Sequence, residues 1–246
     1  MHTEAVILTA DEVDSIEAWK VSVIVPVLNE QARIGALLDR LAAMAGFHEV
    51  IVVDGGSDDG TVEIVRSRSA VRGVSAPKGR ATQMNAGSGI ATGDVLLFLH
   101  ADVRLPDDAV RRVRESLADP EVVAGAFRTW TVADAGRSWL APFLHLADLR
   151  SRVTSLPYGD QALFVRAATF RRIGGFPEIE LMEDVELSRR LRRAGRIRRV
   201  RASVTVSGRR FLARPLYYPL LMTLFPLLFR LGVPPSRLAR LYGEPR

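Results

Sequence analysis

Short apolar runs alternate with helical spacings of apolar residues through the first half of the chain. The run Val21–Val27 (VSVIVPV) is β-branched and continuous, which is typical of a buried parallel strand. Ile34, Leu37, Leu38 and Leu41 follow at helical spacing. The same reading predicts further strands over 50–53, 71–76 and 94–99, and helices over 61–68, 81–91 and 107–117. This alternation predicts an α/β fold with a mostly parallel sheet and right-handed crossovers.

The second half of the chain is less regular. Its pattern predicts a long strand over 122–132, a helix over 139–153, a short strand over 161–165, a helix over 183–194 stopped by Gly195, and a strand over 197–206. No tandem repeat or low-complexity linker interrupts the chain. We therefore expect one α/β domain over residues 21–213, an N-terminal extension over 1–20 and a C-terminal helical segment over 214–246.

Composition narrows the class of protein. The chain has 246 residues, of which 48% are hydrophobic and 25% charged, so it can bury a sizeable core. It has no cysteine, which excludes a disulfide scaffold, a thiolate zinc site, an iron–sulfur cluster and a cysteine nucleophile. The absence of cysteine fits a reducing compartment, and we expect a cytoplasmic protein. The first 20 residues are acidic, unlike a secretory signal, and no apolar run reaches the ~18 residues of a membrane span.

The net charge of +6 comes almost entirely from arginine, because Lys20 and Lys78 are the only lysines. A basic balance suggests an anionic partner: phosphate, nucleic acid or a membrane surface. Eleven arginines lie between residues 189 and 214. A solvated helix face is the default interpretation of these charges, attraction to anionic lipid the second and RNA the third, since no stacking aromatics interleave them.

Polar residues follow three of the predicted strands where each strand ends. They are Asn29-Glu30, the turn over residues 54–60 (DGGSDDG) and His100-Ala101-Asp102. Ligands of open α/β sheets bind at the carboxyl ends of the strands, so three carboxylate-bearing loops converge on one edge. Each acid also has a purely structural interpretation as a turn or helix cap, which is strongest for Asp58 and Asp59. The chain has no G-x-G-x-x-G after its first strand, no P-loop and no G-x-S-x-G elbow.

Four segments in this order resemble a family 2 glycosyltransferase of the GT-A fold. They read VSVIVPVLNE, EVIVVDGGSDDGT, KGRATQMNAGSGIATGDVLLFLHADV and GGFPEIELMEDVELSRRLRRAG, and the resemblance spans about residues 21–210. The combination is specific, although any one segment would be weak. The chain is most similar to the small bacterial branch described as radical-SAM/selenodomain-associated glycosyltransferases.

The resemblance implies a donor site for a nucleotide-sugar, with uridine or guanosine as the nucleoside. It places Asp102 as the metal-binding last residue of a D-x-D motif that holds Mg²⁺ or Mn²⁺. This chain departs from the motif at its first position, where His100 replaces the usual aspartate. The donor-side residues that the resemblance implies are Pro26, Leu28, Glu30, Asp54, Gly55, Arg80, His100, Ala101, Asp102, Arg209 and Arg210.

The resemblance also implies the catalytic and acceptor side. Asp184 would be the base that accepts the acceptor's proton, with Glu183 beside it, and Gly175 and Phe176 would shape the acceptor side. Acids at a helix start also oppose the helix dipole without any catalysis, so Glu183 and Asp184 have a structural alternative. Likewise, Gly174-Gly175-Phe176 has the alternative of a simple turn.

The apolar segment over 215–229 (PLYYPLLMTLFPLLF) is too short to span a membrane. It predicts either a helix that packs on the core or an interfacial segment that brings the enzyme to a lipid-linked acceptor.

Taken together, these features predict a metal-dependent, inverting glycosyltransferase that moves a sugar from a nucleotide donor to an acceptor hydroxyl or phosphate. We expect no nucleic-acid partner and a location in the cytoplasm or at the inner face of the cell membrane. The alternatives are a nucleotidyltransferase of related fold and a basic protein that binds nucleic acid or membranes without catalysis. A nucleotidyltransferase usually has a glycine-rich, arginine-bearing loop after its first strand, where this chain has LNEQARIG.

Overall fold

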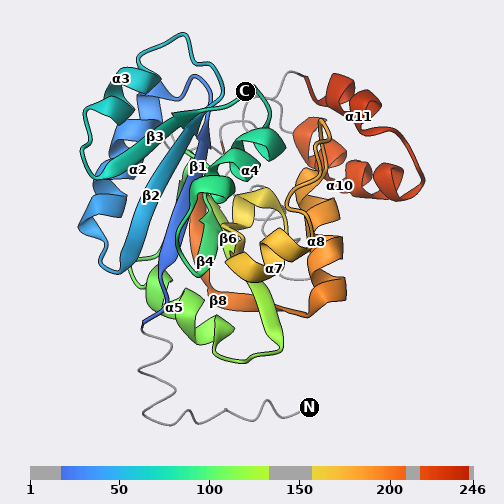
Figure 1. Cartoon of the computed structure of the whole chain (residues 1–246). Coiled ribbons are helices and arrows are strands. Elements are labelled where there is room, and N and C mark those ends of the chain that lie inside the picture. Colours follow the sequence, from blue (N-terminus) through green and yellow to red (C-terminus); the bar gives the residue numbers. More distant parts are fainter. Residues whose placement is uncertain (1–17, 133–156, 209–216, 244–246) are drawn as a thin grey trace.

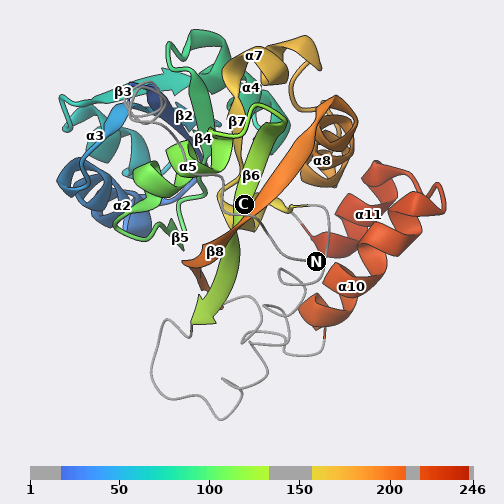
Figure 2. The same cartoon turned by 90° about the horizontal axis from the view of Figure 1, so that it is seen from below.

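An eight-stranded sheet organises the chain, with helices on both of its faces (Figures 1 and 2). The computed structural model describes residues 18–132, 157–208 and 217–243. The strand order is β3-β2-β1-β4-β7-β6-β8-β5. The strands are β1 Val21–Val27, β2 Phe47–Asp54, β3 Val71–Ser75, β4 Val95–Phe98, β5 Val103–Arg104, β6 Val122–Val132, β7 Phe164–Arg166 and β8 Arg196–Ser207.

The first four strands pair in parallel, as their continuous apolar runs predict. Strand β1 lies between β2 and β4 and is buried along its whole length. Its valines at 21, 23, 25 and 27 enter one apolar core, whereas Ile24 enters the other, because successive side chains point to opposite faces. The mostly parallel α/β sheet expected from the sequence is confirmed.

Two layers of helices cover these faces. Helices α2 and α5 pack with the first core, and α4, α7 and α8 pack with the second. Figure 2 shows the two groups on opposite sides of the sheet. The helices are α2 Gln31–Ala43, α3 Thr61–Arg66, α4 Arg80–Ile90, α5 Ala109–Leu117, α7 Ala167–Arg172, α8 Glu183–Ala194, α10 Tyr217–Arg230 and α11 Pro235–Tyr242, with a 3-10 turn η1 over Gly159–Gln161.

The second half of the sheet corrects part of the sequence interpretation. The strand expected over 161–165 begins only at Phe164, because Gln161 ends a 3-10 turn and Ala162 is left-handed, with φ 46°. Strand β7 then runs antiparallel to both β4 and β6. The sequence pattern missed β5 and α7, which are two and six residues long and too short for a clear period, whereas α11 falls within the helical segment expected over 214–246. The helix expected over 139–153 lies outside the described residues.

Helices α10 and α11 lie beside α8 at the end of the described chain (Figure 1). Leu221, Phe225 and Leu238 are buried against Leu181, in the segment before α8. One face of α10 is therefore buried in a small cluster that is separate from the two cores of the sheet, and the expectation that residues 215–229 pack on the core stays a prediction. Within the described ranges, no helix is long and apolar enough to cross a membrane. The division at residues 20 and 214 stays a prediction.

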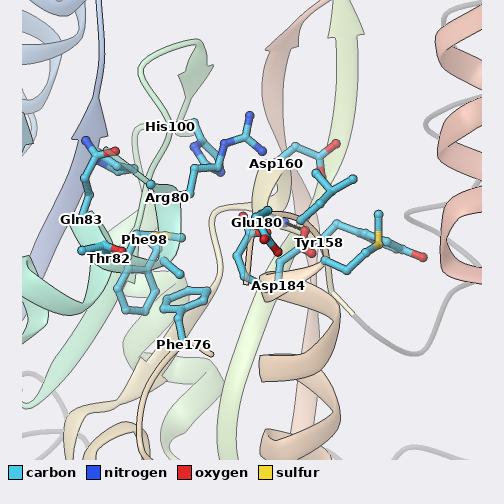
Figure 3. Close-up of a pocket in the computed structure, with 18 of the residues that line it drawn as sticks. Arg80, Thr82, Gln83, Phe98, His100, Tyr158, Asp160, Phe176, Glu180 and Asp184 are labelled. Carbon is cyan, nitrogen blue, oxygen red and sulfur yellow. Dashed lines mark hydrogen bonds between the residues drawn. The ribbon is translucent and has the colours of Figure 1, made fainter. Parts of the chain in front are cut away.

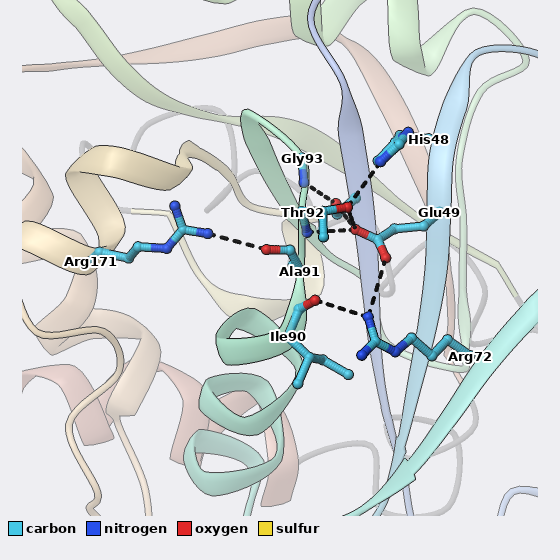
Figure 4. A network of polar contacts seen from close by, with 9 residues as sticks. His48, Glu49, Arg72, Ile90, Ala91, Thr92, Gly93 and Arg171 are labelled. Atoms are coloured by element: carbon cyan, nitrogen blue, oxygen red, sulfur yellow. Dashed lines mark hydrogen bonds and ion pairs between the residues drawn. The ribbon is translucent and has the colours of Figure 1, made fainter.

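A polar network ties the amino ends of the parallel strands together (Figure 4). One oxygen of Glu49, on β2, accepts hydrogen bonds from Ser22 Oγ (2.7 Å), Thr92 N (2.7 Å) and Thr92 Oγ1 (2.8 Å). Arg72 on β3 adds an ion pair at 4.0 Å. Burial would raise the pKa of Glu49, but the hydrogen bonds from Thr92 and Ser22 outweigh it and lower that pKa. The network lies at the edge of the sheet opposite the carboxyl ends of β1 and β4.

Candidate active site

A cavity of about 430 Å³ opens at the carboxyl ends of β1 and β4. Its walls come from the loops after these strands, the start of α4, residues 158–160, residues 178–184 and the α10–α11 pair. Figure 3 shows Arg80 and His100 on the sheet side of the cavity and Asp184 at the first turn of α8. The loops after β1 and β4 therefore meet in one site, as expected for the carboxyl edge of a parallel sheet.

Gln83 fixes the start of α4 against the sheet. Its buried amide Nε2 donates to the carbonyl oxygens of Val27 and Val53, both at 2.8 Å, at the ends of β1 and β2. Val27 O also accepts a hydrogen bond from Gly55 N at 2.9 Å, so the ends of both strands and the turn after β2 are tied together here. Because α4 begins at Arg80, the same amide anchors the helical turn that carries Arg80.

Arg80 is a cationic residue in the cavity wall with several acids around it. Burial lowers its pKa, but the charges of Glu183, Asp184 and Asp102 raise it further, so the guanidinium stays protonated. A half-buried guanidinium in a cavity is suited to bidentate contacts with phosphate oxygens.

Asp184 is held from two directions. Its Oδ2 accepts a hydrogen bond from Gly159 N at 2.8 Å, and its Oδ1 accepts one from Val185 N at 2.7 Å. The first bond comes from a separate loop, so the carboxylate is more than a cap of its own helix. Ser188 Oγ donates to Pro157 O at 2.8 Å and ties the same loop to α8. These contacts fix the position of one carboxylate in the cavity wall.

The absence of a side chain at Gly159 leaves room for His100. A Cβ at residue 159 would lie 2.8 Å from His100 Nε2 and 3.6 Å from Asp184 Oδ2. The histidine that departs from the usual motif thus lies in the same part of the cavity as the candidate base.

Glu183 is a buried acid, only 5% exposed, next to Asp184. Burial and the neighbouring charge of Asp184 raise its pKa to about 7, although Arg80 opposes the shift. A buried carboxyl at the start of α8 costs stability, which is typical of a functional position rather than a simple cap.

Three non-glycine residues of the described chain have left-handed backbones: Asn29 (φ 54°), Ala162 (φ 46°) and Met182 (φ 71°). Asn29 and Met182 each directly precede residues that line the cavity. Such conformations cost free energy and concentrate at functional sites.

The carboxylate of Asp54 stabilises the turn in which it lies. Its carboxylate accepts hydrogen bonds from Gly56 N (2.9 Å) and Ser57 N (3.1 Å), and neither Asp54 nor Gly55 lines the cavity. Asp59 accepts hydrogen bonds from Gln31 N and Thr61 N, the first residues of α2 and α3, which agrees with a structural role in this loop. The contact of Asp54 with a nucleotide base stays a prediction.

Gly175 also has a structural explanation. Its φ of 68° and a Cβ position only 2.7 Å from Asn85 Oδ1 exclude a side chain. Asn85 donates to Phe176 O and accepts from Phe176 N, both at 2.9 Å, so this segment is tied to α4. Phe176 packs edge-on to Phe98 and lines the cavity, whereas Gly175 does not.

The structure brings most of the predicted site residues into one cavity. Arg209 and Arg210 lie outside the described residues. The sequence interpretation missed a second group of lining residues: Tyr158, Gly159, Asp160, Phe225, Pro226 and Tyr242. A polar run at 158–161 between apolar residues was a usable signal, but nothing in the local sequence brings Tyr242 to this place. The predicted residues that do line the cavity are Pro26, Leu28, Glu30, Arg80, His100, Ala101, Asp102, Phe176, Glu183 and Asp184.

The described residues hold no group of three or more acids, histidines or cysteines arranged for a metal ion. Asp102 nevertheless offers carboxylate oxygens to the cavity, which suit Mg²⁺ or Mn²⁺. This donor set fits a cation that takes its remaining ligands from a bound phosphate compound and from water, rather than a metal centre built from protein alone.

Comparisons with known proteins agree with this architecture. The model of the family described as glycosyl transferase family 2 matches residues 22–172. An undecaprenyl-phosphate 4-deoxy-4-formamido-L-arabinose transferase from Aeromonas hydrophila is 34% identical over 119 residues, which cover 44% of this chain and 36% of that relative. A protein of the same name from Pseudomonas aeruginosa is 32% identical over 158 residues, covering 60% of this chain and 46% of that relative. The chain thus spans less than half of the length of these relatives.

Two solved structures share the fold. The mannosyltransferase PcManGT from Pyrobaculum calidifontis, in complex with GDP-Man and Mn²⁺, has a TM-score of 0.60 and 24% identity over 77% of this chain and 57% of that chain. TarS from S. aureus has a TM-score of 0.61 and 21% identity over 92% of this chain and 42% of that chain. The fold is that of the GT-A glycosyltransferases. The chain belongs to glycosyl transferase family 2, because the family model covers more than half of its length.

Proposed function

We propose that this chain transfers a sugar from a nucleoside diphosphate donor to a lipid-linked acceptor, with inversion at the anomeric carbon and with the help of a divalent cation. The observation that carries the proposal is one cavity in which Arg80 and Asp102 face a carboxylate, Asp184, that is fixed by Gly159. Membership of family 2 supports sugar transfer.

The donor side of the proposal rests on charge. A departing nucleoside diphosphate carries negative charge, and Arg80 is a cation in the cavity wall that can contact its oxygens. Asp102 would hold a Mg²⁺ or Mn²⁺ ion, which neutralises part of the same charge when it is bound. The GDP-Man and Mn²⁺ named for PcManGT and the UDP-GlcNAc named for a TarS complex support a nucleotide-sugar donor of this kind.

On the acceptor side, Asp184 acts as the base when the acceptor is a hydroxyl. The acceptor oxygen forms a bond to the anomeric carbon while the bond from that carbon to the diphosphate oxygen breaks on the opposite side. Asp184 takes the proton of a hydroxyl acceptor, and the nucleoside diphosphate leaves with its electron pair. Because this is a single displacement, the configuration at the anomeric carbon inverts.

A lipid phosphate is the acceptor that the relatives' names favour, since both are undecaprenyl-phosphate transferases. A phosphate monoester has a second pKa near 6 and is largely ionised at pH 7, so its oxygen needs no base. A hydroxyl acceptor does need one. The dependence of the rate on Asp184 therefore distinguishes the two acceptor classes.

The experiment is a panel of uridine and guanosine diphosphate sugars with Mn²⁺ or Mg²⁺, followed by thermal shift and by release of free nucleoside diphosphate. A donor that binds only the folded protein raises the melting temperature. We expect release of nucleoside diphosphate with one donor class, accelerated by a polyprenyl phosphate. Release of pyrophosphate instead would indicate a nucleotidyltransferase, and no binding of any donor would overturn the proposal. The cytoplasmic location also stays a prediction.

A further inference from the structure

Helix α10 has a second apolar face that nothing in the described chain covers. Six of the seven large apolar side chains exposed in the described residues lie between 217 and 243, so exposure is concentrated in one place. Four of them form what we call the leucine row: Leu220 (57% exposed), Leu224 (38%), Leu227 (54%) and Leu231 (73%). Spacings of four, three and four residues place the row along one side of the helix.

The leucine row differs from the face that packs on the protein. Leu221 and Phe225, on the inner face, are buried with Leu238 and Leu181. Phe225 and Pro226 of α10 and Tyr242 of α11 also line the active-site cavity. One helix thus contributes an inner wall to the cavity and an outer row of leucines to the surface.

The surroundings of the leucine row are positively charged. Residues 217–243 contain Arg230, Arg237 and Arg240 and no aspartate or glutamate. Exposed leucines beside arginines, with no acid among them, are the composition of a helix that lies in the interface of an anionic bilayer.

We infer that the leucine row is a membrane-docking surface that seats the α10–α11 pair on an anionic lipid bilayer. A second copy of the chain fits this face less well, because a two-fold contact would bring the same arginines toward their own copies. The inference rests on the proposed function in one respect. Because the inner face of α10 lines the cavity, docking places the cavity next to the lipid phosphates that the proposed acceptor carries.

Vesicle co-sedimentation tests this surface without substrates. The probes are vesicles of phosphatidylglycerol with phosphatidylcholine, and vesicles of phosphatidylcholine alone. Replacing all four leucines of the row with serine is expected to lower partitioning to the anionic vesicles on the order of 100-fold or more, because apolar area no longer leaves water. Trp130→Ser is the matched control, since Trp130 is 44% exposed and lies on β6 rather than on the α10–α11 pair. It is expected to sediment like the wild type.

A second variant separates charge from apolar contact. Changing Arg230, Arg237 and Arg240 to glutamine is expected to reduce binding to anionic vesicles about 100-fold at low salt, with little effect on neutral ones. Circular dichroism and the melting temperature confirm that each variant is folded.

Several outcomes would overturn the inference. The inference is wrong if the wild type binds neither kind of vesicle, or if the serine variant binds anionic vesicles as well as the wild type does. It is also wrong if the wild type is a dimer and the serine variant a monomer while both bind vesicles equally. Donor affinity, measured by calorimetry without vesicles, is independent of the leucine row. Normal donor binding without vesicle binding would therefore reject docking alone, and vesicle binding without any donor would reject the proposed function alone.

Discussion

Replacing Asp184 with asparagine tests the base directly, and the contacts of the carboxylate define what the change does. Asp184 accepts two backbone hydrogen bonds, from Gly159 N and Val185 N. Asparagine has one acceptor oxygen and one amide nitrogen, so it keeps one of these bonds and sets an N–H against the other N–H. The variant therefore loses a hydrogen bond to a charged group as well as the ability to take a proton.

The two losses differ in size. A hydrogen bond to a charged group contributes about 1.5–3 kcal/mol to the free energy of unfolding, which lowers the melting temperature of a chain of this size by several degrees. Loss of a general base slows transfer by about 10²–10⁴-fold, which is roughly 2.7–5.4 kcal/mol of activation free energy. We expect the variant to stay folded at 25 °C and to bind donor normally while its turnover falls by this factor.

The assay follows release of nucleoside diphosphate from the donor in two arms, one with water as the acceptor and one with a polyprenyl phosphate. Asp184→Asn is expected to show the full loss with water and a smaller loss with the phosphate, which is already ionised. Ser188→Ala is the matched control, because it removes the Ser188 Oγ to Pro157 O bond of the same loop but leaves the carboxylate in place. It is expected to lose about 1 kcal/mol of stability and to keep its turnover within a few-fold. Near-wild-type release to water by a donor-bound Asp184→Asn, or an equal loss in Ser188→Ala, would refute the role of base.

Three further changes test other parts of the molecule. The raised pKa of Glu183 means that the folded state binds more protons than the unfolded state between about pH 4.5 and about pH 7, so stability falls as pH rises through that window. Glu183→Gln is therefore expected to raise the melting temperature relative to wild type more at pH 8 than at pH 5, and an equal difference at both would contradict this. The pKa of Glu49 is lowered, so its contribution is present above its ordinary value and lost as pH falls through the lower folded value. Glu49→Gln is expected to destabilise the protein at pH 7 and much less near pH 3, as measured by urea unfolding; the same loss at both would rule out the ionised network. Asp102→Ala is expected to remove most of the Mn²⁺ dependence of nucleoside diphosphate binding in calorimetry. If the dependence is retained, Asp102 is not a ligand of the metal.

The parallel half of the fold was predictable because burial on both faces leaves a direct mark on the sequence. Strand β1 is apolar at nearly every position, and α2 repeats its leucines at helical spacing. The short elements β5 and α7 leave no such mark, since their residues are set by the pairing of β5 with β8 and of α7 with the sheet. Tertiary contacts decide these segments, and a local pattern does not record them.

The candidate site was predictable where residue type carries the chemistry and not where the backbone does. Arg80, Asp102 and Asp184 are recognisable as side chains of a defined chemistry. Gly159 contributes an N–H that every residue except proline possesses, and its partner lies 25 positions away. Asp54 illustrates the opposite problem, because an aspartate at a strand end serves a turn as readily as a ligand.

The two edges of the sheet have opposite effects on the stability of the folded state. At the amino edge, Glu49 is ionised and fully engaged, so this edge favours the folded state. At the carboxyl edge, a buried acid at Glu183 and left-handed backbones at Ala162 and Met182 oppose it. A selection for heat resistance alone would therefore recover changes such as Met182→Gly and Glu183→Gln before changes at Glu49. Such changes would raise the melting temperature and at the same time alter the residues beside Asp184, so the thermal stability of this chain is linked to the composition of its cavity.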